Sequence, residues 1–463
     1  MKTKANWLDS TTTAENEVLP KYVKWAWSTR AVSLAINVIF IMQLTYYCTD
    51  ILMMPTLMVG TLLLVSKIFD GFTDLIVGFI IDKTNTKLGK ARPYEIFIVL
   101  VWLFTIMLYS TPEIGITGKA VWVFILYSLI NSICATFLNG ADAVYLARSV
   151  RSEKNRVSLM SFNGAFVMLG SISVSMLLPQ LIAGIGMTKR GWTMIALMIG
   201  VPCALIGMLR FVFVKEVSTE KPKTLEKAKS GTGVSLKEGL KCLVKNKYIF
   251  MLAAMTFLIQ LQTNMNSAVN TYYFKYVIGD IGLASLISMT SILTPVFLIV
   301  FPVLSKKFGS TNLLRASAVI GVAGFIVRII GGINIPLLIV GSILITVSSI
   351  PISIMISIYL IDCMDYGEWK TGIRIEGIMT SVNSFTSKLG SGIASGLVGL
   401  VMGVCGYNGT LDVQPASAIL SINALFNYIP LLLTVVFAVF AFMYRIDRHL
   451  AQIKADLGAK RTN

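Results

Sequence analysis

The most distinctive chemistry in the sequence is a pair of carboxylates inside an otherwise apolar segment. Asp70 and Asp74 lie one helical turn apart, the hydroxyl of Thr73 lies between them, and Lys67 precedes them. In a helix, the spacing i, i+3, i+7 places Lys67, Asp70 and Asp74 on one face. Oxygen ligands of this kind suit a small hard cation such as Na⁺, and neighbouring carboxylates equally suit a shared proton. We therefore expect a cation site, with a purely structural ion-pair cluster as the alternative.

A second charge lies deep in an apolar run near the C-terminal end. Lys388 is about 13 residues into the run 376–404, which places it near the middle of a membrane-spanning helix. A cation at that depth needs a partner, and Asp70 and Asp74 are the acids of matching depth. The sequence therefore predicts that the run 376–404 faces the run 57–81. The alternative is that Lys388 extends its ammonium group to a membrane surface.

Uncharged polar side chains supply candidates for binding a solute. Amides and aromatic side chains together are typical of sugar sites, where they meet hydroxyl groups and the apolar face of the ring. The candidates are Asn37, Tyr46, Asn139, Asp142, Gln260, Asn264, Asn266 and Tyr272. The alternative is that the amides join neighbouring helices. Asp142 has a further alternative, as the ion-pair partner of Arg148 or Arg151 at the end of its helix.

Composition indicates the kind of element that must position these residues. The chain has 463 residues, of which 55% are hydrophobic and only 14% are charged, against roughly 25% charged in soluble domains. At roughly 20 residues per span, the chain can supply on the order of twelve membrane-spanning helices. A soluble enzyme, a secreted disulfide scaffold and a disordered protein are excluded. With one His and 6 Cys without metal-type spacing, we expect no cofactor and no metal beyond a cation at the carboxylate pair.

The apolar runs define an all-α integral membrane fold, because lipid offers no partners for an open backbone. The predicted spans are 26–48, 57–81, 95–111, 120–146, 158–184, 192–214, 249–273, 282–304, 313–332, 336–361, 376–404 and 416–443. The longest polar break follows the sixth span. We therefore predict a tail (1–25), a six-helix bundle (26–214), a linker (215–247), a second six-helix bundle (248–443) and a tail (444–463).

The basic residues predict the orientation in the membrane. About 33 of the 40 Lys and Arg residues fall in loops on one side, together with the linker and both tails. Positively charged loops stay in the cytoplasm, so we expect both termini to be cytoplasmic. The net charge of +17 is then a signal of topology, and a nucleic-acid partner is not expected. The predicted location is the cell membrane, in the manner of a bacterial inner-membrane protein.

Two long motifs carry a resemblance to a known family. The first is Asp70-Gly-Phe-Thr-Asp74 followed by Gly78 and the loop from Asp82 to Pro93, and the second runs from Asp362 to Gly377 and is followed by Lys388. Both motifs resemble the glycoside–pentoside–hexuronide:cation symporters of the major facilitator superfamily, a group that includes the melibiose permease.

The resemblance implies roles for these residues. Asp70 and Asp74 resemble the family's cation-binding carboxylates, and Lys388 resembles the lysine that pairs with them; Lys67 falls where the melibiose permease has an arginine. The loops resemble a cytoplasmic gate, whose residues here are Asp82, Gly89, Arg92, Asp365, Glu368 and Arg374. The superfamily also implies a working monomer.

The sequence departs from the melibiose permease at two carboxylate positions. The helix IV carboxylate that serves both sugar and cation falls at Asn139, and the helix I carboxylate that binds the sugar falls at Leu34. This difference argues against a melibiose-like substrate. Under one hypothesis Asp142, a turn after Asn139, takes the place of the lost acid.

The expected function is secondary transport of a sugar or glycoside together with Na⁺ or H⁺, by alternating access of two bundles around a central site. The same fold equally suits an amphipathic, lipid-like solute. A polytopic membrane enzyme would require a catalytic motif in a loop, and the short outer loops show none. A sensor without transport activity would not need Asp70, Asp74 and Lys388.

Overall fold

The computed structural model describes most of the chain as helix. It describes residues 19–84, 86, 88–150, 153–216, 242–372, 376–411, 413–446, 449, 452, 453 and 456. The chain divides into two compact units, Met1–Lys229 and Ser230–Asn463. The division falls inside the predicted linker 215–247, and each unit is treated separately below.

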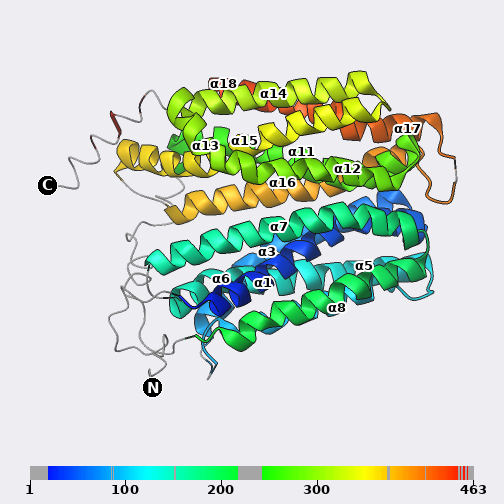
Figure 1. Cartoon of the computed structure of the whole chain (residues 1–463), viewed down its shortest axis with the longest axis horizontal. Coiled ribbons are helices and arrows are strands. Elements are labelled where there is room, and N and C mark those ends of the chain that lie inside the picture. The colour runs from blue at the N-terminus through cyan, green and yellow to red at the C-terminus, as the bar shows by residue number, and fades with distance from the viewer. Residues whose placement is uncertain are drawn as a thin grey trace. The chain divides into compact units, whose positions relative to one another are not determined.

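The first unit contains the helical segments expected for the first six spans. They are α1 (Lys21–Ile41), α2 (Leu44–Tyr46), η1 (Tyr47–Ile51), α3 (Thr56–Lys83), η2 (Arg92–Ile96), α4 (Phe97–Leu108), α5 (Ile116–Ser128), η3 (Leu129–Ala135), α6 (Thr136–Ser149), α7 (Glu153–Ile185) and α8 (Lys189–Phe213). Helix α1 packs against α7 and α8, while α3 packs against α5 and α6 (Figure 1). This packing brings the predicted cation pair on α3 next to the polar face of α6.

The second unit contains the remaining segments. They are α11 (Lys247–Tyr272), η4 (Tyr273–Ile278), η5 (Ile281–Leu283), α12 (Ala284–Met289), η6 (Thr290–Ile292), α13 (Leu293–Phe308), α14 (Ser310–Gly331), α15 (Ile335–Thr371), α16 (Glu376–Val404), α17 (Ala416–Asn423), η7 (Ala424–Tyr428) and α18 (Ile429–Met443). Helix α14 lies along α15, and α11 lies along α16 (Figure 1).

The all-helical membrane fold is confirmed for the described residues. Among them, 10 helices are long and apolar enough to cross a membrane. The predicted spans 57–81 and 95–111 are also helical, but α3 carries charges along its second half and α4 has only 12 residues. The count of twelve spans and the cytoplasmic placement of the termini stay predictions.

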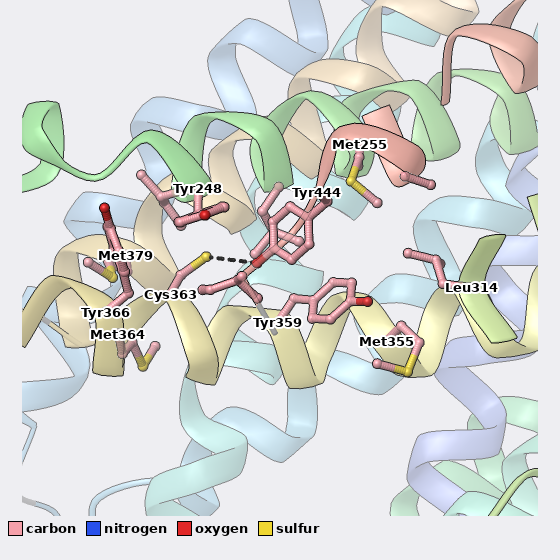
Figure 2. Close-up of a cluster of buried hydrophobic side chains, with 14 of the residues drawn as sticks. Tyr248, Met255, Leu314, Met355, Tyr359, Cys363, Met364, Tyr366, Met379 and Tyr444 are labelled. Atoms are coloured by element: carbon pink, nitrogen blue, oxygen red, sulfur yellow. Dashed lines mark hydrogen bonds between the residues drawn. The ribbon is translucent and has the colours of Figure 1, made fainter. Parts of the chain in front are cut away.

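The core of the second unit lies where α11 begins and where α15 and α18 end. It is built from tyrosine, methionine and cysteine side chains, including Tyr248, Met355, Tyr359, Cys363 and Tyr444. Figure 2 shows these side chains converging between the helices, with a hydrogen bond of 3.3 Å between Cys363 Sγ and Tyr444 Oη. The core therefore supports the end of α15 that carries the second predicted gating motif.

Candidate functional site

The predicted cation residues lie in the middle of α3. The carboxylate of Asp70 is buried and lies 3.3 Å from the hydroxyl of Thr136 on α6. The hydroxyl of Thr73 donates to the backbone carbonyl of Asp70 at 2.9 Å, which leaves the lone pairs of that oxygen available to a cation. Lys67 places its ammonium group 5.7 Å from the centre of the Tyr127 ring. The side chain of Asp74 lies outside what the structure describes, so the carboxylate pair itself stays a prediction.

Helix α6 brings candidate substrate residues close to this position. It follows the π-helical turn η3, and π-helical turns occur often at functional sites. Thr136, Asn139 and Asp142 follow one another at intervals of three residues, so they share one broad face of the helix. Asn139 is exposed, and the side chain of Asp142 is 36% exposed. One helix therefore joins the buried Asp70 to an open polar surface.

Asp142 belongs to a closed arrangement of four charges, which we call the charge ring: Arg30, Glu95, Asp142 and Arg210. Asp142 Oδ1 accepts hydrogen bonds from Arg30 Nη2 and, at 2.7 Å, from Arg210 Nη1. Glu95 Oε2 lies 3.4 Å from Arg30 Nε and 3.5 Å from Arg210 Nε. Each arginine therefore touches both acids, and the formal charges of the ring sum to zero.

The charge ring is buried apart from Asp142. Arg30 is 3% exposed, and Arg210 and Glu95 are 0% exposed. The guanidinium carbon of Arg210 lies 3.5 Å from the centre of the Trp27 ring, so an aromatic face covers the cation where water cannot. This pairing differs from the alternative expected for Asp142: Arg148 contacts Glu216 at 3.3 Å instead, and Arg151 lies outside the described residues.

The predicted gating loop is anchored by a carboxylate that the sequence did not identify. Glu216 accepts hydrogen bonds from the backbone N–H groups of Lys90, Ala91 and Arg92 at 2.9, 2.9 and 3.0 Å. Successive N–H groups turned toward one anion form a strong binding concavity. Gly89 has φ +118°, and a Cβ on it would lie 2.3 Å from Glu216 Oε2. The loop therefore requires glycine both for its backbone angle and for room.

The side chain of Arg92 fixes the same loop to the end of α8. Its Nε and Nη2 donate to the carbonyl oxygen of Phe211 at 3.0 and 2.8 Å. The side chain of Asp82, the other predicted gate residue of this loop, lies outside what the structure describes. The gate itself stays a prediction.

The second unit carries the other predicted charges. Lys388 is half-buried on α16, two residues before Gly390, where α16 comes so close to α11 that a Cβ would lie 2.9 Å from Phe257 O. Asp365 and Glu368 lie half-buried near the end of α15, and Arg374 lies outside the described residues. The predicted pairing of Lys388 with Asp70 or Asp74 joins two units and stays a prediction.

Most other substrate candidates occupy helix contacts. Asn37 donates to Thr105 Oγ1 at 2.8 Å, and Asn266 donates to the carbonyl of Phe426 at 3.1 Å. Tyr46 packs 6.3 Å from the Trp192 ring centre, and Tyr272 packs 5.4 Å from that of Tyr407. On α11, Asn264 donates to the carbonyl of Gln260 at 2.8 Å, and both side chains are half-buried. The amides therefore join helices at several of these positions, whereas Asn139 and Asp142 face open space.

Comparison with known proteins decides the family. Residues 30–448 match the model of the family described as MFS/sugar transport protein. The chain belongs to this family. The isoprimeverose transporter of Lactiplantibacillus pentosus is 29% identical over 90% of this chain and 87% of its own length. The glucuronide carrier protein homolog of Escherichia coli (strain K12) is 24% identical over 89% of each chain.

Solved structures agree on the fold. The xylose transporter XylE from E. coli, in a partially occluded inward-open conformation, aligns with a TM-score of 0.60 at 13% identity. The alignment covers 92% of this chain and 98% of the other. The nucleoside transporter NupG aligns with a TM-score of 0.57 over 90% of this chain and 98% of its own. This member of the MFS/sugar transport protein family is therefore a multi-pass membrane transporter and not a membrane enzyme.

Sequence reasoning missed four functional candidates in this transporter: Arg30, Glu95, Arg210 and Glu216. Each lies within about three turns of a predicted span end, where a charge is ordinarily assigned to a loop or to the positive-inside bias. The available signal was the number of charges: two acids and two arginines close to the ends of four apolar runs. Which of them would meet depended on how α1, α4, α6 and α8 pack.

Proposed function

We propose that this transporter carries a sugar or glycoside across the membrane by symport with Na⁺ or H⁺, and that Asp70 and Asp74 hold the cation. The observation that carries the proposal is the buried Asp70 carboxylate beside Thr136, because a buried carboxylate in a membrane-spanning helix needs a cation, a proton or an ion-pair partner. The names of the isoprimeverose transporter and of the E. coli putative glycoside/cation symporter support both the solute and the coupling.

The mechanism follows from linkage between two ligands. The cation and the sugar stabilise the same conformation, so each raises the affinity for the other by the same factor. Asp70 contacts α6 through Thr136, and α6 carries Asn139 and Asp142 three and six residues later. Filling the cation site can therefore change the position of the helix that carries the sugar candidates. Lys388 is proposed to pair with the carboxylates when the cation has left.

The test is uptake into liposomes that contain the purified protein. Radiolabelled glycosides, pentoses and hexuronates are offered under an imposed Na⁺ gradient and, separately, a proton gradient. We expect one gradient to drive accumulation and the Asp70→Asn and Asp74→Asn proteins to lose it, while sugar exchange across the membrane persists. Accumulation that survives both substitutions would contradict the proposed cation site. No sugar uptake under either gradient would favour an amphipathic, lipid-like solute.

Thr73 offers a matched pair that identifies the cation. Na⁺ requires several oxygen ligands, whereas a proton requires only the carboxylate. If Na⁺ is the coupling ion, Thr73→Ala should raise the Na⁺ concentration for half-maximal uptake, and Thr73→Ser, which keeps the oxygen, should not. Unchanged cation dependence in both proteins would indicate H⁺.

A further inference from the structure

Asp142 is a charged side chain that remains accessible within a membrane-spanning segment. Its side chain is 36% exposed, while the other three members of the charge ring are at most 3% exposed. Asn139, one turn earlier on α6, is also exposed. A carboxylate directed at lipid is costly, and ionisable residues within spans face water-filled cavities or the bundle interior. This face of α6 therefore lines an aqueous path.

The charge ring fixes one oxygen of Asp142 and leaves the other available. Both arginine hydrogen bonds end on Oδ1. Among the described residues, Oδ2 has no hydrogen-bond partner. Two charge-assisted bonds from buried guanidinium groups hold the carboxylate ionised and in one orientation. Oδ2 is thus a rigid, negatively charged acceptor facing the path.

A fixed carboxylate acceptor selects its ligand by chemistry. It accepts hydrogen bonds from the hydroxyl groups of a sugar, and it repels a carboxylate on a substrate. The two arginines cannot serve a substrate anion instead, because they are buried behind Asp142 and already bonded to it. The ring therefore fits the hydroxyl-bearing part of a neutral sugar.

We propose that Asp142 is a substrate-binding residue that accepts hydrogen bonds from hydroxyl groups of a neutral sugar, with Arg30 and Arg210 as positioning residues. The proposal rests on the proposed sugar transport and adds the class of sugar and the group that reads it. It also gives the connection between the two ligands: Thr136 contacts Asp70, and Asp142 lies six residues later on the same helix.

The experiment uses the neutral sugar with the highest uptake and its series of single-deoxy analogues, each missing one hydroxyl. The KM for uptake is measured for the wild-type protein and for Asp142→Asn. In the wild type, loss of the hydroxyl that meets Asp142 should raise KM about 10- to 100-fold, as expected for a hydrogen bond to a charged group. In Asp142→Asn the same analogue should lie within about threefold of the parent sugar, because a hydrogen bond between neutral groups contributes less.

Glu95→Gln is the matched control. It removes the other acid of the same ring, but Glu95 is fully buried and does not reach the path. We expect it to lower uptake of all the sugars in proportion and to preserve the discrimination between parent and deoxy analogue. Should Asp142→Asn fail to fold, Asp142→Glu keeps the charge and moves the carboxylate by one methylene, so the analogue that suffers most should change.

Each outcome decides between the two proposals. A wild-type protein that takes up no sugar overturns sugar transport and this proposal together. A wild type that transports sugar, with full hydroxyl discrimination retained in Asp142→Asn or an unchanged analogue order in Asp142→Glu, overturns this proposal alone. A wild type with a higher kcat/KM for a uronate than for the matching neutral sugar overturns the neutral class.

Discussion

The two units fasten their ends with different physical interactions. In the first unit, α1, α6, α8 and the segment before α4 meet at the charge ring, where Arg30 and Arg210 share Asp142 and Glu95. In the second unit, α11, α15 and α18 meet at a core of tyrosine, methionine and cysteine side chains (Figure 2). Desolvated charges require matched partners and a fixed geometry, whereas apolar contacts have no direction.

This difference separates precision from tolerance. A ring of alternating charges can hold a carboxylate in one orientation while leaving one oxygen exposed, as at Asp142. An apolar core resists the loss of volume but accepts other side chains of similar size. We therefore expect changes in the ring to be costly and charge-specific, and changes in the second core to depend on volume.

The largest effect is expected from Arg210→Gln. The substitution leaves two acids to share Arg30 in a buried position, and removal of one partner from a buried ion pair costs about 3–5 kcal/mol. Equilibrium unfolding in mixed micelles measures the free energy. The double variant Glu95→Gln with Arg210→Gln restores neutrality and should be more stable than the single variant. A loss below about 1 kcal/mol in the single variant would show that water solvates the ring and would end the contrast with the second unit.

An intermediate effect is expected from Glu216→Gln. The carboxylate accepts three backbone N–H groups of the gating loop and pairs with Arg148, and hydrogen bonds to a charged group contribute about 1.5–3 kcal/mol. Weaker anchoring should speed tryptic cleavage at the lysines of this loop. Glu113→Gln is the control, because Glu113 pairs with Lys189 at an exposed position where such a pair contributes little. Equal cleavage rates in the two variants would contradict the anchoring role.

The smallest effect is expected from Met355→Leu in the second core. Met355 is fully buried, and the exchange nearly conserves its volume, so the cost should stay below about 1.5 kcal/mol. Met355→Ala, which leaves a cavity, should cost about 2–5 kcal/mol in the same unfolding measurement. A leucine variant as unstable as the alanine variant would show that the second core is as demanding in shape as the charge ring is in charge.

The sequence by itself determined the membrane class, the helical content and the residues of the cation motif. These follow from composition and periodicity, because lipid permits only a backbone that satisfies its own hydrogen bonds. The motifs around Asp70 and Lys388 also predicted the family that the comparison shows. Local rules suffice for such features, since each depends on residues close together in the chain.

Only the tertiary structure decided which charges meet. Arg30 and Asp142 are separated by 112 residues, and Asp142 and Arg210 by 68, so their pairing depends on how α1, α6 and α8 pack. The sequence offered Arg148 or Arg151 as partners for Asp142 because they are its neighbours in the chain. The structure instead buries two distant arginines behind Asp142, since each buried charge must find an opposite charge wherever the helices bring one within reach.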